Sequence, residues 1–299
     1  MNKLLLILIF AALTLASPAT AYLAYVSNEK GNTISIIDTD KLDVVATIKV
    51  GRRPRGVELN KDGSELYICA GDDDAIQVLD TKAQKIIGKL PSGPDPELLT
   101  LSPDGETIYV SNENDNLVTL IDIKRKDQIG DIPVGVEPEG MAISPDGKLL
   151  VNTSETTNMA HIIDTKTKTI IANILVDNRP RFATFKHDGS ELWVSSEVGG
   201  TVSVIDPEKK TIKQKISFDI PGLSKEAIQP IGVSITRDGA HAFVALGPAN
   251  RVAVINAQTK EVEKYLLVGQ RVWHLTFTPD EKYLLTARSE EHTLNSSHV

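Results

Sequence analysis

The sequence contains a single cysteine, Cys69, in 299 residues. One thiol excludes an internal disulfide framework, a thiolate zinc site and haem attachment through a C-x-x-C-H motif. Cys69 is separated by multiples of 42 residues from Ser27, Ser111 and Ser195. We therefore expect it to be a small core residue that fills the same position as these serines.

Aromatic residues are also scarce, basic residues are not in excess, and common catalytic motifs are absent. Aromatics make up 5% of the chain, so the core must come from Val, Ile and Leu. The 40 Asp and Glu outnumber the 32 Lys and Arg, which leaves no basic footprint for nucleic acid. No G-x-S-x-G, H-E-x-x-H or glycine-rich phosphate loop occurs, and the sequence therefore predicts no enzyme of these classes.

The amino terminus is typical of a secretory signal peptide. Lys3 precedes an apolar run from Leu4 to Leu15, and Ala19-Thr20-Ala21 forms an A-x-A cleavage site. We expect residues 1–21 to be removed and the mature protein to be periplasmic or secreted. No later apolar run is long enough to cross a membrane.

What the sequence has in abundance is a repeat of 42 residues. One unit holds four short alternating segments, at residues 98–102, 107–111, 117–121 and 128–134. A period in the forties with four strands per unit is typical of a β-propeller. Two series of aspartates follow the 42-residue spacing, and they are Asp38, Asp80, Asp122, Asp164 and Asp206 at strand ends, and Asp62, Asp104, Asp146 and Asp188 in Asp-Gly turns. In both series the spacing increases by eight residues between Asp206 and Asp238.

Second-strand anchors recur seven times, from Tyr25 to Leu285. This predicts an all-β, seven-bladed β-propeller with four-stranded blades, formed by residues 22–287 as one domain. After Ala287 the pattern stops, and we expect residues 288–299 to be a non-native tail. The last blade would then be truncated, and the ring would not be closed by the native C-terminal strands.

The candidate binding site is the ring of residues around the channel mouth. The loops from fourth to first strands and from second to third strands lie on one face of a propeller. Residues on either side of the inner-strand prolines vary in charge from repeat to repeat, although their position within the repeat is constant. Arginine forks suit carboxylate or phosphate, but arginines and glutamates that only pair with each other would give the same pattern. The candidates are Arg53, Arg55, Glu97, Glu137, Glu139, Arg179, Arg181, Arg271, Trp273 and His274.

Two further features fall on the mouth face. The second-to-third-strand loops add carboxylates, at Glu29, Glu113, Glu155 and Glu197 among others. The eight-residue insertion belongs to residues 218–229, where it would form either a lid or partner-contact loop or a tolerated surface decoration.

The Tyr-Val-Ser-Asn motif at residues 25–28 and 109–112, in its 42-residue frame from about Tyr25 to Thr286, resembles the YVTN-type β-propeller family. The chain is most similar to its exported members called PQQ-dependent catabolism-associated, which accompany bacterial quinoprotein alcohol dehydrogenases. The resemblance implies a non-enzymatic binding or scaffold protein of the periplasm. Its partner would be a periplasmic quinoprotein dehydrogenase or a small molecule. No cofactor is evident from the residues, and an association with PQQ or Ca²⁺ is implied by the resemblance only.

The alternative is a lactonase-like hydrolase in which a divalent cation at the central channel activates water. Glu97 and Glu139, on neighbouring blades, would then be metal ligands, because hard cations prefer carboxylate oxygens.

Overall fold

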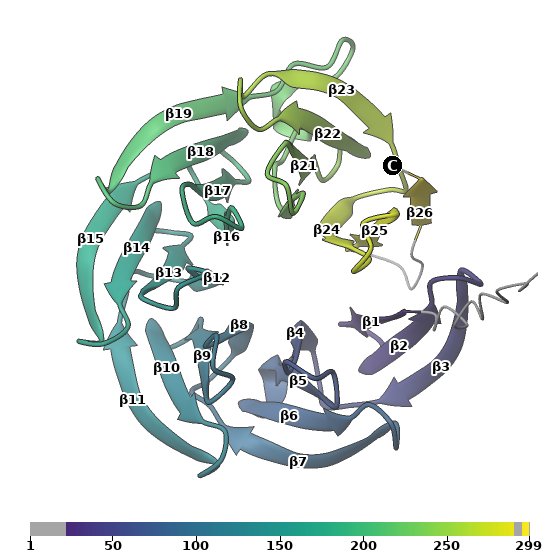
Figure 1. The fold of residues 1–299 in the computed structure, drawn as a ribbon, viewed down its shortest axis with the longest axis vertical. Coiled ribbons are helices and arrows are strands. Elements are labelled where there is room, and N and C mark those ends of the chain that lie inside the picture. Colours follow the sequence, from purple (N-terminus) through teal and green to yellow (C-terminus); the bar gives the residue numbers. More distant parts are fainter. Residues whose placement is uncertain (1–21, 290–294, 299) are drawn as a thin grey trace, which may run out of the picture.

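The computed structural model describes residues 22–289 and 295–298, so the expected signal peptide lies outside the described residues. The described chain is built of strands, with two single-turn 3-10 helices, η1 (Gly71–Asp73) and η2 (Lys225–Ala227). Short alternating segments rich in Val, Ile and Leu favour strands, because their branched side chains pack well on a pleated surface. Figure 1 shows the sheets arranged in a ring around a central channel.

Each sheet is an antiparallel meander whose first strand lies nearest the channel and whose last strand forms the outer rim. The first sheet comprises β1 (Leu23–Asn28), β2 (Thr33–Asp38) and β3 (Asp43–Lys49). The next comprises β4 (Pro54–Leu59), β5 (Glu65–Ala70), β6 (Ala75–Asp80) and β7 (Lys85–Pro91). It is followed by β8 (Pro96–Leu101), β9 (Thr107–Asn112), β10 (Leu117–Asp122) and β11 (Asp127–Pro133).

The second half of the ring continues in the same way. One sheet comprises β12 (Pro138–Ile143), β13 (Leu149–Ser154), β14 (Met159–Asp164) and β15 (Thr169–Leu175). The next comprises β16 (Pro180–Phe185), β17 (Leu192–Ser196), β18 (Thr201–Asp206) and β19 (Thr211–Ser217). Then come β20 (Val233–Ile235), β21 (His241–Ala245), β22 (Arg251–Asn256) and β23 (Val262–Leu267). The last sheet comprises β24 (Val272–Phe277), β25 (Tyr283–Arg288) and β26 (Asn295–His298).

The expected seven-bladed propeller with four-stranded blades is wrong. Seven such blades would need 7 × 4 = 28 strands, and the described chain has 26, enough to complete six blades and not seven. Five sheets have four strands, whereas the sheets at the two chain ends have three each. The prediction of seven four-stranded blades failed because it counted only second strands. A second strand is present even in a sheet that lacks one of its other strands.

The end of the chain also differs from the pattern. β25 continues to Arg288, and β26 pairs with β25 from Thr286↔Asn295 to Tyr283↔His298. Residues 290–294 and 299 lie outside the described residues. The non-native origin of the tail stays a prediction from the sequence.

The two repeated aspartates close turns. Asp104 Oδ1 accepts the backbone N–H of Glu106 at 3.0 Å, and Gly105 supplies the positive φ of 75° that this turn requires. Asp122 Oδ1 accepts the N–H of Arg125 at 2.7 Å, and both turns lie on the face opposite the channel mouth. The 42-residue period therefore reflects mainly the residues that form the turns.

The core lies between neighbouring sheets and is mainly aliphatic, with Tyr67 and Trp193 as its largest fully buried side chains. Cys69 is free and fully buried in this core, which confirms the expectation of a small core residue. It occupies the position at which Ser111 and Ser195 donate hydrogen bonds to the next inner strand.

Glycine and bulky side chains alternate at the third position of the inner strands. A Cβ on Gly56 would lie 2.9 Å from the Glu97 carbonyl, and one on Gly140 would lie 2.9 Å from the Arg181 carbonyl. Glycine at these positions lets one inner strand approach the backbone of the next. The intervening strands carry Leu98, Phe182 and His274 at this position.

A repeated local geometry holds the channel mouth. The residue before each of the inner strands β4, β8, β12, β16 and β24 adopts a left-handed φ of 48–59°. A side-chain oxygen from the preceding sheet accepts its backbone N–H at 2.8–3.1 Å, which stabilises this conformation. The pairs, each 21 residues apart, are Asn32 with Arg53, Asp74 with Asp95, Asn116 with Glu137, Asn158 with Arg179, and Asn250 with Arg271.

The insertion coincides with the one break in this geometry. Gly200 stands where the other copies carry Asn or Asp, and it offers no side-chain acceptor. Phe218, Ile220 and Ile228 anchor the insertion in the core, and each is less than 9% exposed. Asp219 donates its N–H to the Tyr265 hydroxyl of β23 at 3.1 Å. Figure 1 shows the projecting part of the insertion at the outer rim beside β23, not over the channel as a lid would be.

Replacing Asn116 with Gly should lower the free energy of unfolding by about 1 kcal/mol, because the bond to the Glu137 N–H is lost while the left-handed backbone stays accessible. Urea unfolding measures the change. Asn116→Asp is the matched control, because Asp74 makes the same bond one repeat earlier. Equal stability of the Gly and Asp variants would contradict the role of this bond.

Candidate functional site

A cavity of about 920 Å³ runs from the mouth to the opposite face, where Leu59, Thr278 and Pro279 line it. It extends from the inner strands of the central sheets to the region between β1 and β24. Eight of the ten candidate residues line it, namely Arg53, Arg55, Glu139, Arg179, Arg181, Arg271, Trp273 and His274.

Arg55, on β4, links three sheets at the mouth. Its guanidinium contacts Glu97 through Nε, Glu139 Oε1 at 3.2 Å through Nη2, and Glu29 Oε2 at 3.3 Å through Nη1. The neighbouring Arg53 contacts Glu97 at 2.5 Å and pairs with Asp95. The inner strands β4, β8 and β12 are thereby tied together across the channel.

Arg181, on β16, forms the second half of the same network. Its Nη1 lies 3.2 Å from Glu139 and 2.5 Å from Glu155, and its Nε lies 2.8 Å from Glu197. Arg179 adds contacts to Glu155 at 2.8 Å and to Glu197 at 3.3 Å. Glu139, only 4% exposed, therefore lies between Arg55 and Arg181.

Carboxylates outnumber arginines in this network. Burial raises the pKa of Glu97 to about 7, and Arg55 and Arg53 only partly offset this effect. Burial and the nearby Glu139 raise the pKa of Glu155 to about 7 as well. The mouth thus contains more carboxyl groups than arginines, and a further positive charge would stabilise the ionised form of these carboxyl groups. Four arginines (Arg53, Arg55, Arg179, Arg181) meet seven acids (Glu29, Asp95, Glu97, Glu113, Glu139, Glu155, Glu197).

Aromatic side chains line the cavity beside Arg181. The Arg181 guanidinium carbon lies 5.3 Å from the centroid of the Trp273 ring, within the range of a cation–π contact. The Phe182 and His274 rings meet edge to face at 4.9 Å. Burial lowers the pKa of His274 to about 4, so this imidazole is neutral at pH 7.

Two predicted residues have other contacts. Glu137 accepts a hydrogen bond from the Thr156 hydroxyl and does not line the cavity. Arg271 lines the cavity, where its Nε donates to the Ser289 hydroxyl at 3.1 Å.

Sequence reasoning placed the loop carboxylates Glu29, Glu113, Glu155 and Glu197 on this face but did not include them in the site. The 42-residue repeat already indicated that they belong to the site, because their loops follow the second strands on the same face as the arginines. Phe182 was missed, because an apolar residue in an inner strand gives no signal that it faces a channel.

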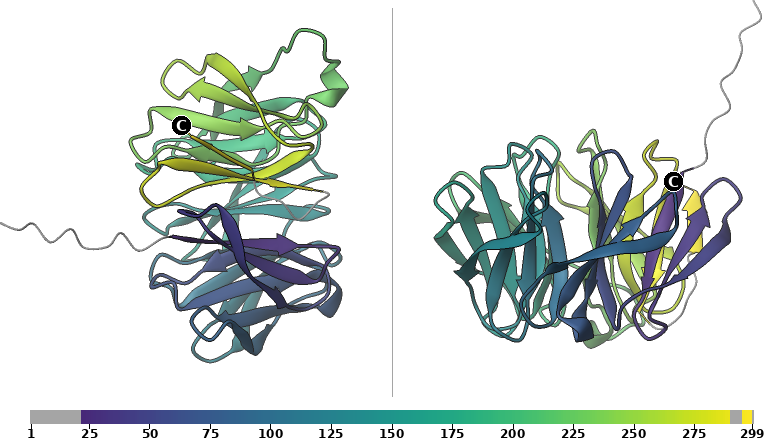
Figure 2. Two further views of the ribbon diagram at one scale, coloured as in Figure 1. Left: turned by 90° about the vertical axis from the view of Figure 1, so that its right-hand side faces the viewer. Right: turned by 90° about the horizontal axis from the view of Figure 1, so that it is seen from below.

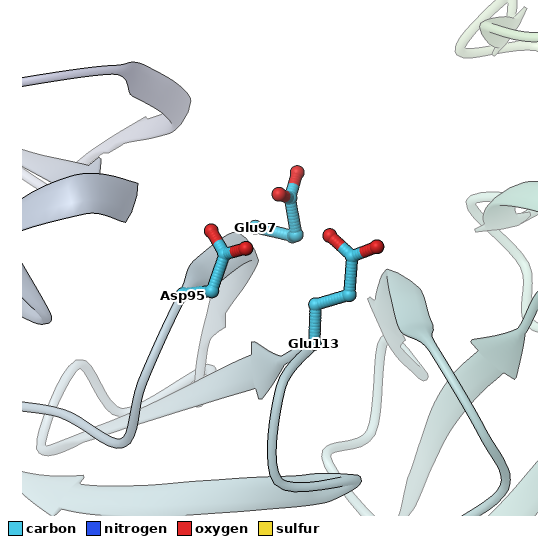
Figure 3. Close-up of side chains that lie close together, drawn as sticks. All are labelled: Asp95, Glu97 and Glu113. Carbon is cyan, nitrogen blue, oxygen red and sulfur yellow. The ribbon is translucent and has the colours of Figure 1, made fainter.

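The residues do not fit the expected divalent cation between Glu97 and Glu139, because Arg55 contacts both carboxylates. A second group, Asp95, Glu97 and Glu113, has carboxylate oxygens within 4.8 Å of one another (Figure 3). Arg53 contacts all three acids, with its Nη2 4.0 Å from Glu113. In both places a guanidinium supplies the positive charge that a metal ion would bring.

Sheets around a channel, with loops and turns at its two ends (Figure 2), define a β-propeller, here with a charged mouth. A model of the choice-of-anchor I domain matches residues 116–282, more than half of the chain, and the chain belongs to this family. Membership fits a non-catalytic binding or scaffold role and a surface or secreted protein.

The fold is shared widely, since 1740 chains of solved structures match it. One of them, from the hydrazine synthase of Kuenenia stuttgartiensis, superposes with a TM-score of 0.85 over 93% of this chain and 92% of that chain. Its sequence identity is 19%, so the likeness concerns the fold alone. No curated protein matches the sequence. In the part of the chain that the structure describes, no helix has the length and hydropathy of a membrane span.

The raised pKa values of Glu97 and Glu155 predict that the protein loses stability as the pH rises from about 5 to 7.5. In this window the folded state holds protons that the unfolded state has released, so the free energy of unfolding falls with pH. Glu97→Gln should flatten the slope by up to about 1.4 kcal/mol per pH unit, the value for one proton. Thermal unfolding between pH 5 and 8 measures the slope.

Glu137→Gln is the control for this experiment, because Glu137 lies on the same face but outside the network. It should leave the slope unchanged. A wild-type slope that is flat or rising between pH 5 and 7.5 would contradict the assignment.

Proposed function

We propose that this protein is an exported, non-enzymatic binding or scaffold protein whose channel mouth receives a positively charged group of a partner. The partner we propose is a protein of a periplasmic PQQ-dependent alcohol-oxidising system. The resemblance to exported propellers of PQQ-dependent catabolism supports this choice of system.

The charge balance of the mouth carries the proposal. Seven acids share four arginines, and two of those acids, Glu97 and Glu155, have a pKa of about 7 because burial is not fully offset. A lysine or arginine side chain from a partner would add the missing positive charge. The rim acids Glu29 and Glu113 keep 40% and 28% of their side-chain surface exposed, so an incoming basic group can reach them.

The same balance disfavours PQQ as a direct ligand of the mouth. PQQ carries several carboxylates, and an anion of this kind would meet the surplus of acids in the network unless it bound at Arg271 or Lys30 of the cavity, or together with a cation such as Ca²⁺. A basic surface of the partner protein needs no such bridge. The paired arginines and the aromatic wall give this site a fixed shape, which suits recognition without a conformational change.

The signal-like amino terminus and the choice-of-anchor I family support an exported location. We propose the periplasm because the enzymes that the related propellers accompany are periplasmic. The proposal assigns no catalytic residue to the mouth: the Ser154 hydroxyl lies 3.1 Å from His161 Nε2, but both side chains are buried.

The test is a titration of the purified protein with a quinoprotein alcohol dehydrogenase loaded with PQQ and Ca²⁺, followed by interferometry at 50 and 300 mM salt. Binding should be detected at low salt and weaken at least tenfold at high salt, because exposed charges are screened. Glu29→Gln combined with Glu113→Gln should weaken it further. Free PQQ without Ca²⁺ should not compete.

Glu106→Gln, beside an Asp-Gly turn on the opposite face, is the matched control and should bind like the wild type. Dehydrogenase binding that survives the double variant and high salt would contradict the mouth as the contact. Hydrolysis of a lactone that required added Ca²⁺ and was lost in Glu97→Gln would contradict the non-enzymatic assignment.

A further inference from the structure

The loops of the mouth face are joined to one another by backbone hydrogen bonds. Between β9 and β18 the N–H groups of one loop donate to carbonyls of a neighbouring loop at 2.8–3.0 Å. The pairs are Val134 with Asn116, Glu155 with Glu137, Val176 with Asn158, and Glu197 with Arg179. Because these bonds hold each loop against the next, the side chains of this row of loops lie side by side on the surface.

Three apolar side chains on this row are exposed to solvent. Val136, in the loop before β12, is 43% exposed, and Val198, in the loop before β18, is 60% exposed. Leu175, the last residue of β15, is 64% exposed. We call these three residues the apolar arc. Figure 1 shows β12 to β19 on the side of the ring away from β1 and β24, so the arc does not depend on how the end sheets are completed.

Most other repeats carry polar residues, charged residues or proline at these positions. Counterparts at multiples of 42 residues include Lys30 and Asn114 for Val198, Arg52 and Asn178 for Val136, and Lys49 and Ser217 for Leu175. A single exposed apolar residue is ordinary on a protein surface. Three of them in neighbouring loops, at positions that are polar in other repeats, indicate a contact surface.

The apolar arc borders the acidic network of the mouth. Glu197 directly precedes Val198, and Glu155 lies in the loop that follows the loop of Val136 around the ring. Glu113, at the exposed rim of the network, lies in the loop on the other side of Val136. Charge complementarity gives association rate and specificity more than affinity, whereas apolar contacts supply affinity. The arc therefore offers what the charged mouth alone lacks.

We propose that the apolar arc and the acidic mouth form one interface, which binds a protein segment that carries a lysine or arginine next to apolar side chains. The proposal rests on the function proposed above and adds the apolar half of the contact. The basic group meets the rim acids Glu29 and Glu113, and the apolar side chains cover the arc. Removal of the arc from water stabilises the complex.

Charge argues against two other occupants of this surface. The chain has a formal net charge of -8, so a second copy would bring like charge to the mouth. An anionic lipid surface would be repelled by the same acids. A basic, partly apolar protein segment matches both halves of the surface.

The test uses two fluorescent peptide amides of equal length, in which lysines alternate with leucine pairs or with serine pairs. Each is titrated into the purified protein and followed by anisotropy. The leucine peptide should bind about tenfold more tightly, because its leucines bury apolar surface on the arc. Equal affinity would overturn the arc and leave the acidic mouth as the contact. Binding of neither peptide up to about 1 mM would contradict the proposed function and the arc with it.

A double variant, Leu175→Ser combined with Val198→Asn, removes most of the arc. Ser217 and Asn114 occupy the same positions in other repeats, so the fold should accept both changes. The variant should bind the leucine peptide about tenfold more weakly and the serine peptide as the wild type does. Leu267→Ser is the matched control, because Leu267 ends β23 as Leu175 ends β15 and is 73% exposed, but lies outside the arc. An equal loss in the control would contradict docking on the arc.

Glu29→Gln combined with Glu113→Gln tests the charged half separately. Both peptides should bind this variant more weakly, since both present lysines to the rim. Leucine-peptide affinity that fell in the arc variant but not in the acid variant would overturn the combined interface. Flotation with phosphatidylcholine vesicles that the arc variant lost would assign the arc to a membrane, and a sedimenting dimer that it lost would assign the arc to a second copy. Either result would overturn the proposed occupant.

Discussion

The geometry of the channel mouth depends on one hydrogen bond that is repeated around the ring. A side-chain oxygen, such as that of Asn116, accepts the N–H of a mouth residue in the next sheet, here Glu137, whose backbone is left-handed. A left-handed backbone is unfavourable for a residue with a side chain, and the bond helps offset that cost. The chain then turns sharply enough to bring the second residue of each inner strand into the mouth. Where Gly200 replaces the acceptor, the connection is eight residues longer and is anchored by Phe218 and Ile220.

Placing charged residues at this mouth has an electrostatic consequence. Arg55 and Arg181 share Glu139 from opposite sides, so the network spans five sheets and cannot be divided into separate ion pairs. Buried ion pairs gain little stability because their desolvation is expensive. Their benefit here is positional, since each guanidinium holds several carboxylates in fixed places. The unmatched acids leave the mouth receptive to a further cation and couple its charge state to pH.

The alternation of Gly56, Leu98, Gly140 and Phe182 shows that adjacent sheets are not equivalent, although each repeat has 42 residues. Glycine lets one inner strand approach the next, and the bulky residue of the neighbouring strand is left to face the channel. The true structural unit of the inner wall is thus a pair of sheets. In this way the aromatic wall at Phe182 and His274 arises on one side of the channel.

The sequence by itself determined the repeating unit, because turn aspartates, Asp-Gly pairs and strand alternation act over a few residues. It predicted the strands of the 97–138 repeat to within about two residues and placed Arg53, Arg55, Glu97 and Glu139 on one face. It did not determine how many strands each end sheet holds, because pairing joins residues far apart in the chain. Only the tertiary structure decided that Arg55 bridges Glu97 and Glu139, that Glu137 lies apart, and that Phe182 faces His274. Those outcomes depend on side-chain reach across a channel, which a one-dimensional period does not encode.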